Sequence, residues 1–223
     1  LDANTTASYN TAVGHTSLTG NTTGAQNTSI GQGSMNDNTT GGNNVAVGFS
    51  ALTANTTAID NVAVGGSAMA ANTTGTNNVA VGSYALDANT TTSENTAIGD
   101  YALSANTAAN NTAVGSSSML ANTTGAGNTA VGMDALTANT TAADNVAVGM
   151  NALLTTTTGA NNTAVGTSAL KLNTGASNTA VGRGSLLNNS TGTFNVAMGH
   201  DALNDNTTAS YNVAVGYGAL QAN

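Results

Sequence analysis

Residues 44–60 read NVAVGFSALTANTTAID, and residues 61–77 repeat the pattern as NVAVGGSAMAANTTGTN. A block of the form NTAVG, NVAVG or a close variant begins thirteen times, at intervals of 17 residues or, twice, of 16. A fixed period along a chain is the signature of a repeat architecture, in which each unit packs mainly against its two neighbours. The blocks begin at Asn10, Asn27, Asn44, Asn61, Asn78, Asn95, Asn111, Asn128, Asn145, Asn162, Asn178, Asn195 and Asn212.

The repeat occupies the chain from end to end. Twelve complete units fill residues 10–211, with a partial unit at 1–9 and another at 212–223. No segment of different composition separates them. We therefore predict a single repeat domain over residues 1–223.

Each unit is numbered here from its first Asn, which is place one. The pattern is N-[TV]-A-[VI]-G-x-x-[AS]-[LM]-x-a-N-T-T-x-x-x, too short for two helices and without a 3.6-residue apolar period. It fits one coil of a β-solenoid. We predict a strand at places one to five ending at a corner Gly, a return strand at places eight to eleven, and a closing turn after it. The fold class is therefore all-β, a parallel β-solenoid of about thirteen coils.

Two columns of the repeat do not vary, the Asn at place one and the Gly at place five. Stacked amides can hydrogen-bond to one another from coil to coil, and Gly permits a corner that other residues resist. We expect these residues to form a structural ladder along the solenoid. In the first five units they are Asn10, Gly14, Asn27, Gly31, Asn44, Gly48, Asn61, Gly65, Asn78 and Gly82.

The strand block carries no charged residue on either face. Places two and four share one face and place three takes the other. A strand that is neutral on both sides is typical of a covered sheet, so we expect other chains to cover one face. The small residue at place three suits close approach, which predicts an inter-chain face at Ala46, Ala63, Ala80, Ala97, Ala113, Ala130 and Ala147.

The strand Val45-Ala46-Val47-Gly48 followed by Ala51-Leu52 resembles the head repeats of YadA-like trimeric autotransporter adhesins. It is equally similar to the NTAVGxxAL repeats of phage tail-fibre and tail-fibre-like proteins. Through this motif the resemblance covers the whole chain. It implies a left-handed β-roll, a homotrimer, and a role in attachment at a cell or virion surface or outside the cell.

Composition excludes several classes of function. With 2 Lys+Arg against 10 Asp+Glu, and a net charge of -8, the chain cannot neutralise phosphates or bind an anionic membrane surface. No apolar run approaches the roughly 20 residues of a membrane span, so membrane insertion is not expected. There is no Cys, the two His lie eleven coils apart, and no grouping of residues fits catalysis or metal binding. We predict a non-enzyme without metal or cofactor.

The aromatic side chains are confined to the expected corners of the coil. All seven aromatic residues stand at places six, seven or seventeen. Tyr84 and Tyr101 share a place in adjacent units, which suggests either an exposed step for a sugar or protein ligand or simple corner stacking. Phe49 and Tyr217 are further possible surface contacts.

Nine Asn residues precede Thr-Thr and match the N-glycosylation pattern. Asn stacking at a solenoid turn is the alternative interpretation, and we favour it. The nine are Asn4, Asn21, Asn38, Asn55, Asn72, Asn89, Asn122, Asn139 and Asn206.

Three functions agree with this sequence. The first is a rigid extracellular rod, an adhesin head or fibre shaft, that attaches to a host surface or matrix receptor. The second is a filament subunit that adds head to tail, because solenoid ends expose unpaired strand edges. The third is ice binding, for which a flat and uncharged sheet of Thr, Val and Ala would be suitable.

Overall fold

The computed structural model describes residues 1–222, which form an all-β chain without a helix. Its strands are parallel and about 17 residues apart, so the predicted β-solenoid is confirmed. The chain forms two compact units, Leu1–Asn110 and Asn111–Asn223.

Every strand has three residues and occupies places two to four of its coil. The first unit contains β1 (Thr11–Val13), β2 (Thr28–Ile30), β3 (Val45–Val47), β4 (Val62–Val64), β5 (Val79–Val81) and β6 (Thr96–Ile98). The second contains β7 (Thr112–Val114), β8 (Thr129–Val131), β9 (Val146–Val148), β10 (Thr163–Val165), β11 (Thr179–Val181), β12 (Val196–Met198) and β13 (Val213–Val215).

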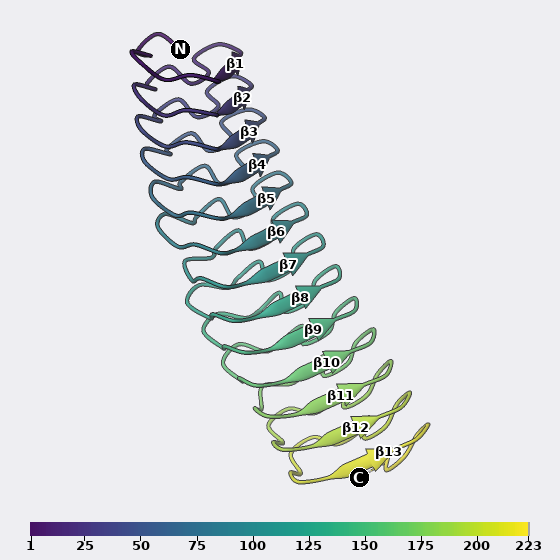
Figure 1. Ribbon diagram of the computed structural model, residues 1–223. Helices are drawn as coiled ribbons and strands as arrows, with labels where there is room; N and C mark the ends of the chain where they lie inside the picture. The colour runs from purple at the N-terminus through teal and green to yellow at the C-terminus, as the bar shows by residue number, and fades with distance from the viewer. Residues whose placement is uncertain (223) are drawn as a thin grey trace. The chain divides into compact units, whose positions relative to one another are not determined.

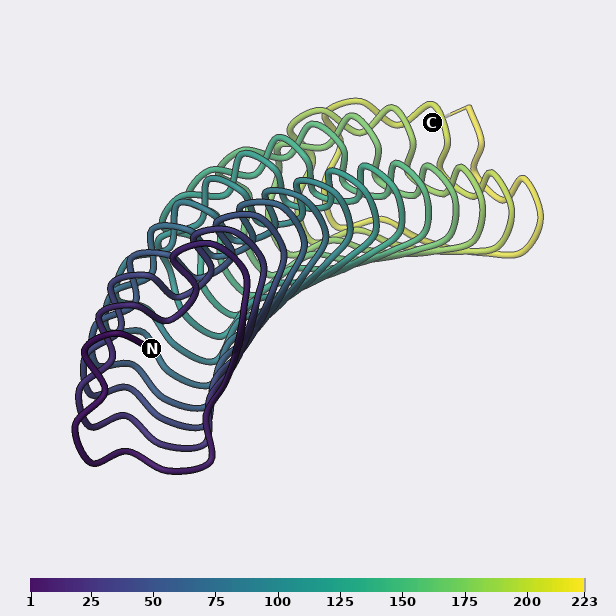
Figure 2. The same ribbon diagram turned by 90° about the horizontal axis from the view of Figure 1, so that it is seen from above.

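Within each unit, every strand pairs with the next one along the chain in the same register. Val45 of β3 lies opposite Val62 of β4, which lies opposite Val79 of β5. Each place of the repeat therefore stacks on itself (Figure 1). Seen from above, successive coils of a unit repeat one outline (Figure 2).

The predicted return strand is wrong. Places eight to eleven form turns, because the backbone at places seven and nine is left-handed, with φ of 51° at Ser50 and 52° at Leu52. An extended strand requires negative φ. The reversed conformation instead turns the place-nine side chain into the coil, where Leu52 is fully buried.

The apolar interior of a coil is built from places three, eight and nine. Ala80, Ala85 and Leu86 each have 0% exposed surface. The predicted inter-chain face at place three is therefore wrong, because these side chains are already buried within a single chain. This correction applies to Ala46, Ala63, Ala80, Ala97, Ala113, Ala130 and Ala147, all 0% exposed.

The invariant Gly at place five has both a conformational and a steric cause. Gly48 has φ of 139°, which L side chains rarely adopt. A Cβ on Gly48 would also lie 2.4 Å from the carbonyl oxygen of Gly65 in the next coil. Any other residue would force neighbouring coils apart.

Two columns of buried Asn side chains form the polar half of the interior. At place one, the backbone N–H of Asn61 donates to Asn44 Oδ1 at 3.0 Å, while Asn44 Nδ2 donates to the Ala58 carbonyl at 2.8 Å. At place twelve, Asn55 Nδ2 donates to Asn38 Oδ1 at 2.7 Å and to the same Ala58 carbonyl at 3.3 Å. Both columns therefore converge on the place-fifteen carbonyl and join the turn to the strand.

All nine Asn residues in the glycosylation pattern stand in the place-twelve column, and eight of them are buried. Asn38 and Asn55, for example, are 0% exposed, and their amide nitrogens are occupied by hydrogen bonds. A glycan on such a nitrogen would have to leave the coil interior. Only Asn4 is exposed. The folded coils therefore favour the stacking interpretation.

The amide column is interrupted once, at Thr156. Its hydroxyl donates to the Asn173 carbonyl at 2.8 Å, but it supplies no amide to the preceding coil. The buried Asn139 Oδ1 and Asn145 Nδ2 are left without a hydrogen-bond partner. An unpaired buried polar atom costs about 1–3 kcal/mol.

We predict that Thr156→Asn stabilises the protein by about 1 kcal/mol, because its amide would pair with Asn139 Oδ1. The measurement is the urea midpoint followed by circular dichroism. Thr158→Asn is the control, since it adds an amide at an exposed site of the same turn and should leave the midpoint unchanged. A midpoint that falls, or that rises equally in both variants, would contradict this account.

Candidate functional surfaces

Places two and four form one continuous surface type, which we call the sheet face. Both project outward from the strand, and in five coils, those of β2, β6, β8, β10 and β12, place four is the more exposed of the two. Ile30 and Ile98 are each 39% exposed, and Met198 is 45% exposed. All residues of the sheet face are Thr, Val, Ile or Met. It therefore offers apolar contact and Thr hydroxyls but no charge.

The turns carry three aromatic stacks, each between successive coils. The rings of Tyr84 and Tyr101 lie 5.1 Å apart at 11°, and both residues are 42% exposed. Phe194 stacks on Tyr211 at 5.3 Å, and His200 stacks on Tyr217 at 5.2 Å. These geometries are those of attractive stacked pairs.

The structure brings together only some of the predicted contact residues. Tyr84 and Tyr101 meet as expected from their shared place. Phe49 is 60% exposed and stacks on no ring among residues 1–222. Tyr217 is 83% exposed and stacks on His200, a partner that sequence reasoning missed although both residues stand at place six.

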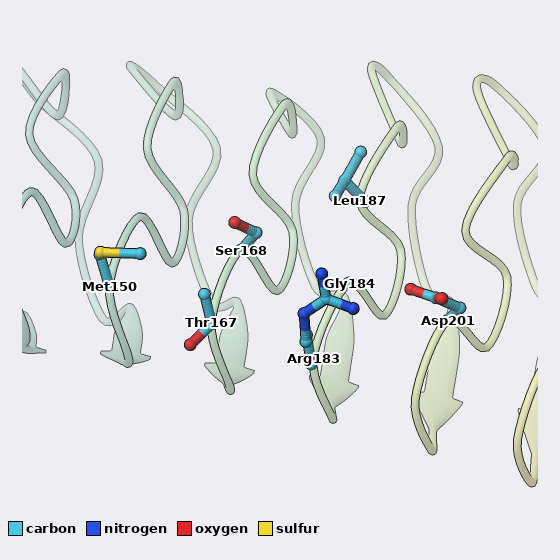
Figure 3. A pocket seen from close by; sticks show the side chains of 7 residues that line it. All are labelled: Met150, Thr167, Ser168, Arg183, Gly184, Leu187 and Asp201. Carbon is cyan, nitrogen blue, oxygen red and sulfur yellow. The ribbon is translucent and has the colours of Figure 1, made fainter.

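The second unit contains a hollow of about 370 Å³ on its turn side, which we call the Arg183 hollow (Figure 3). It was not expected from the sequence, because its walls come from places six, seven and ten of four successive coils. The residues that line it are Met150, Thr167, Ser168, Arg183, Gly184, Leu187 and Asp201.

A chain of polar contacts fixes the cationic wall of this hollow. Arg183 Nη1 lies 2.9 Å from His200 Nε2, and His200 Nδ1 lies 3.0 Å from Asp201 Oδ2. A guanidinium can only donate, so Nε2 is the acceptor of the Arg183 bond. Nδ1 is near the carboxylate but makes no hydrogen bond within residues 1–222. Asp201 Oδ1 accepts a further bond from Asn204 at 3.2 Å. The position of Arg183 is therefore set by its neighbours.

Other site types are not assembled in the described part of the chain. Among residues 1–222, no three His, Asp or Glu side chains are close enough to hold a metal ion together. No helix there has the length and apolar character of a membrane span.

Comparisons with protein-family models, with curated proteins and with solved structures give no match to this chain.

We predict a coupling free energy of about 0.5–1 kcal/mol between Tyr84 and Tyr101, because each ring covers a face of the other. Ser stands at the same place in other coils, so Tyr84→Ser, Tyr101→Ser and the double variant form a cycle that the fold tolerates. The free energy of unfolding in urea measures the coupling. Tyr84→Ser combined with Phe49→Ser serves as the control and should be additive. Additivity in the Tyr84–Tyr101 cycle would contradict the prediction.

Proposed function

We propose that this chain is a structural and adhesive module of an extracellular fibre, a stiff β-solenoid that associates with copies of itself and attaches to a surface. One observation carries the proposal. In a chain with net charge -8, the sheet face is free of charge in every coil, and charged residues are restricted to the turn side. A face kept apolar in this way suits contact with another protein surface.

Stiffness is supported by the direction of the hydrogen bonds. Backbone bonds run from coil to coil, as from Val45 N–H to the Asn61 carbonyl at 2.9 Å and from Gly48 N–H to the Ile30 carbonyl at 2.8 Å. The Asn columns add side-chain bonds along the same direction. Bending a unit would stretch several of these bonds in each coil, so a unit transmits force as a rod.

Self-association is best supported through the sheet face, not through the buried place-three alanines. Its Val and Ile side chains remain half-buried in the single chain, and each Å² of apolar surface removed from water contributes about 25 cal/mol. Sheets pack face to face at about 10 Å with side chains interdigitated. The resemblance to trimeric adhesin heads favours a homotrimer, and with it a surface or extracellular location.

Ice binding is a second candidate, favoured by the spacing of the same face. Parallel strands place Thr hydroxyls and Val methyls at intervals of about 4.8 Å along each column. Thermal hysteresis of a monomeric protein in a cooled droplet would support ice binding over the fibre.

For the fibre module, we predict a solution mass near three times 21.5 kDa by light scattering behind a sizing column. Lys at Val47, Val81 and Val148 should reduce it to one chain with the fold retained, because these outward side chains would place charge in the interface. The three sites avoid adjacent coils, which prevents repulsion within one column.

Two controls separate assembly from folding. Lys at Thr19, Thr53 and Thr137 adds equal charge at place ten, where Lys171 stands naturally, and should keep the assembled mass. Ala80→Glu buries a charge inside the coil and should unfold the protein. A wild-type protein of single-chain mass, or assembly unaffected by the sheet-face Lys variants, would sink the self-association proposal.

A further inference from the structure

On the turn side, the second unit has large apolar residues at places where most other coils have small or polar ones. Place ten is small or polar throughout the first unit, whereas three coils of the second unit have Leu there. Met appears at place six in two successive coils of the second unit, and both Met side chains are exposed. These apolar residues are Leu120, Leu154, Leu187, Met133 and Met150.

The same region has an unusual charge. Residues 145–200 contain no Asp or Glu, and they hold the chain's only Lys and Arg, Lys171 and Arg183. Elsewhere the chain is acidic, with a net charge of -8 overall. An anion is therefore repelled less by these coils than by the rest of the protein, and the one carboxylate in the hollow is that of Asp201.

Arg183 places its positive charge in the lining of the hollow (Figure 3). One guanidinium nitrogen, Nη1, is held by His200 at 2.9 Å, while Nε and Nη2 make no hydrogen bond to residues 1–222. Thr167 and Ser168 line the same space, with Met150 and Leu187 as apolar walls. The carboxylate of Asp201, which also lines the hollow, lies 3.0 Å from His200 Nδ1 and accepts a hydrogen bond from Asn204.

We propose that the Arg183 hollow binds an organic anion with an apolar body, such as a medium-chain carboxylate. The carboxylate pairs with the free guanidinium N–H groups and the neighbouring hydroxyls, and the apolar body covers Leu187 and Met150. Charge-assisted bonds of this kind are the strong ones, and a volume of about 370 Å³ is that of a small-ligand pocket. This site is independent of the sheet face and of self-association.

The methionines provide reporters for a direct test. With methyl-¹³C methionine, the full-length protein has six probes in its NMR spectrum. Met150 lines the hollow, and Met198 is 45% exposed on the sheet face. Met35, Met69 and Met119 are fully buried and report on folding.

Octanoate is the probe, compared with octyltrimethylammonium, which has the same chain and the opposite charge, and with acetate, which lacks the chain. We expect octanoate to shift Met150 saturably and to leave Met198 unmoved. Acetate should bind more weakly. The cation should not shift Met150, although the net charge of the protein would favour it.

Arg183→Ser should weaken octanoate binding by about tenfold or more, and Ser already stands at place six in other coils. Lys171→Thr is the matched control, because it removes the same charge one coil away without lining the hollow, and should change binding less than about threefold. Leu187→Thr should weaken octanoate and leave acetate unchanged. Unshifted Met35, Met69 and Met119 signals will show that each variant is folded.

Several results would overturn the proposal. These are no shift at Met150, equal shifts at Met150 and Met198, a cation that binds as well as octanoate, or equal losses in Arg183→Ser and Lys171→Thr. Each would show that Arg183 is a solvated corner charge.

Discussion

Hydrogen bonding between successive coils at matching places is the constraint on which the rest of the structure depends. Because each residue stacks on its counterpart, a place inside the coil must hold one type of side chain along a unit. The two 16-residue repeats show how strictly this holds. Asn89 Nδ2 donates to the carbonyl three residues on, at 3.0 Å, whereas in the shortened coils Asn106 and Asn173 donate to the carbonyl two residues on, at 2.7 and 2.8 Å. The turn loses a residue and keeps its bond.

The period alone was enough to predict the solenoid, and a corner Gly such as Gly48 was enough to place the strand end. The direction in which the strand faces was not predictable in the same way. Alternation separates Ala46 from Val45 and Val47 without saying which side is inward. The inside is narrow because Leu52 from the turn already fills it, so the smaller side chain faces in. That depends on a contact across the coil, which spacing does not reveal.

The missing return strand has a different cause. Leu at φ near 50° is unfavourable by roughly 1–2 kcal/mol, so local propensity argues against the observed turn. Burying a Leu side chain contributes about 1.5–3 kcal/mol, which offsets that cost in each coil. The Leu and Met residues at place nine therefore gave no indication of a left-handed backbone. Place seventeen did indicate one, because the Asn, Asp and Gly residues found there in several coils tolerate positive φ, as at Asn43 and Asp60.

The stacking of matching places also explains why one candidate site could be predicted from the sequence and the other could not. Tyr84 and Tyr101 share a place, so stacking predicts their contact directly. The Arg183 hollow combines different places from four coils and becomes visible only when the turns are folded. Side chains at places six, seven and ten project away from the Asn columns, so they can differ between coils without disturbing the ladder. A collective property, such as association along the sheet face, therefore belongs to the constant strand, and recognition of a particular ligand belongs to the variable turns.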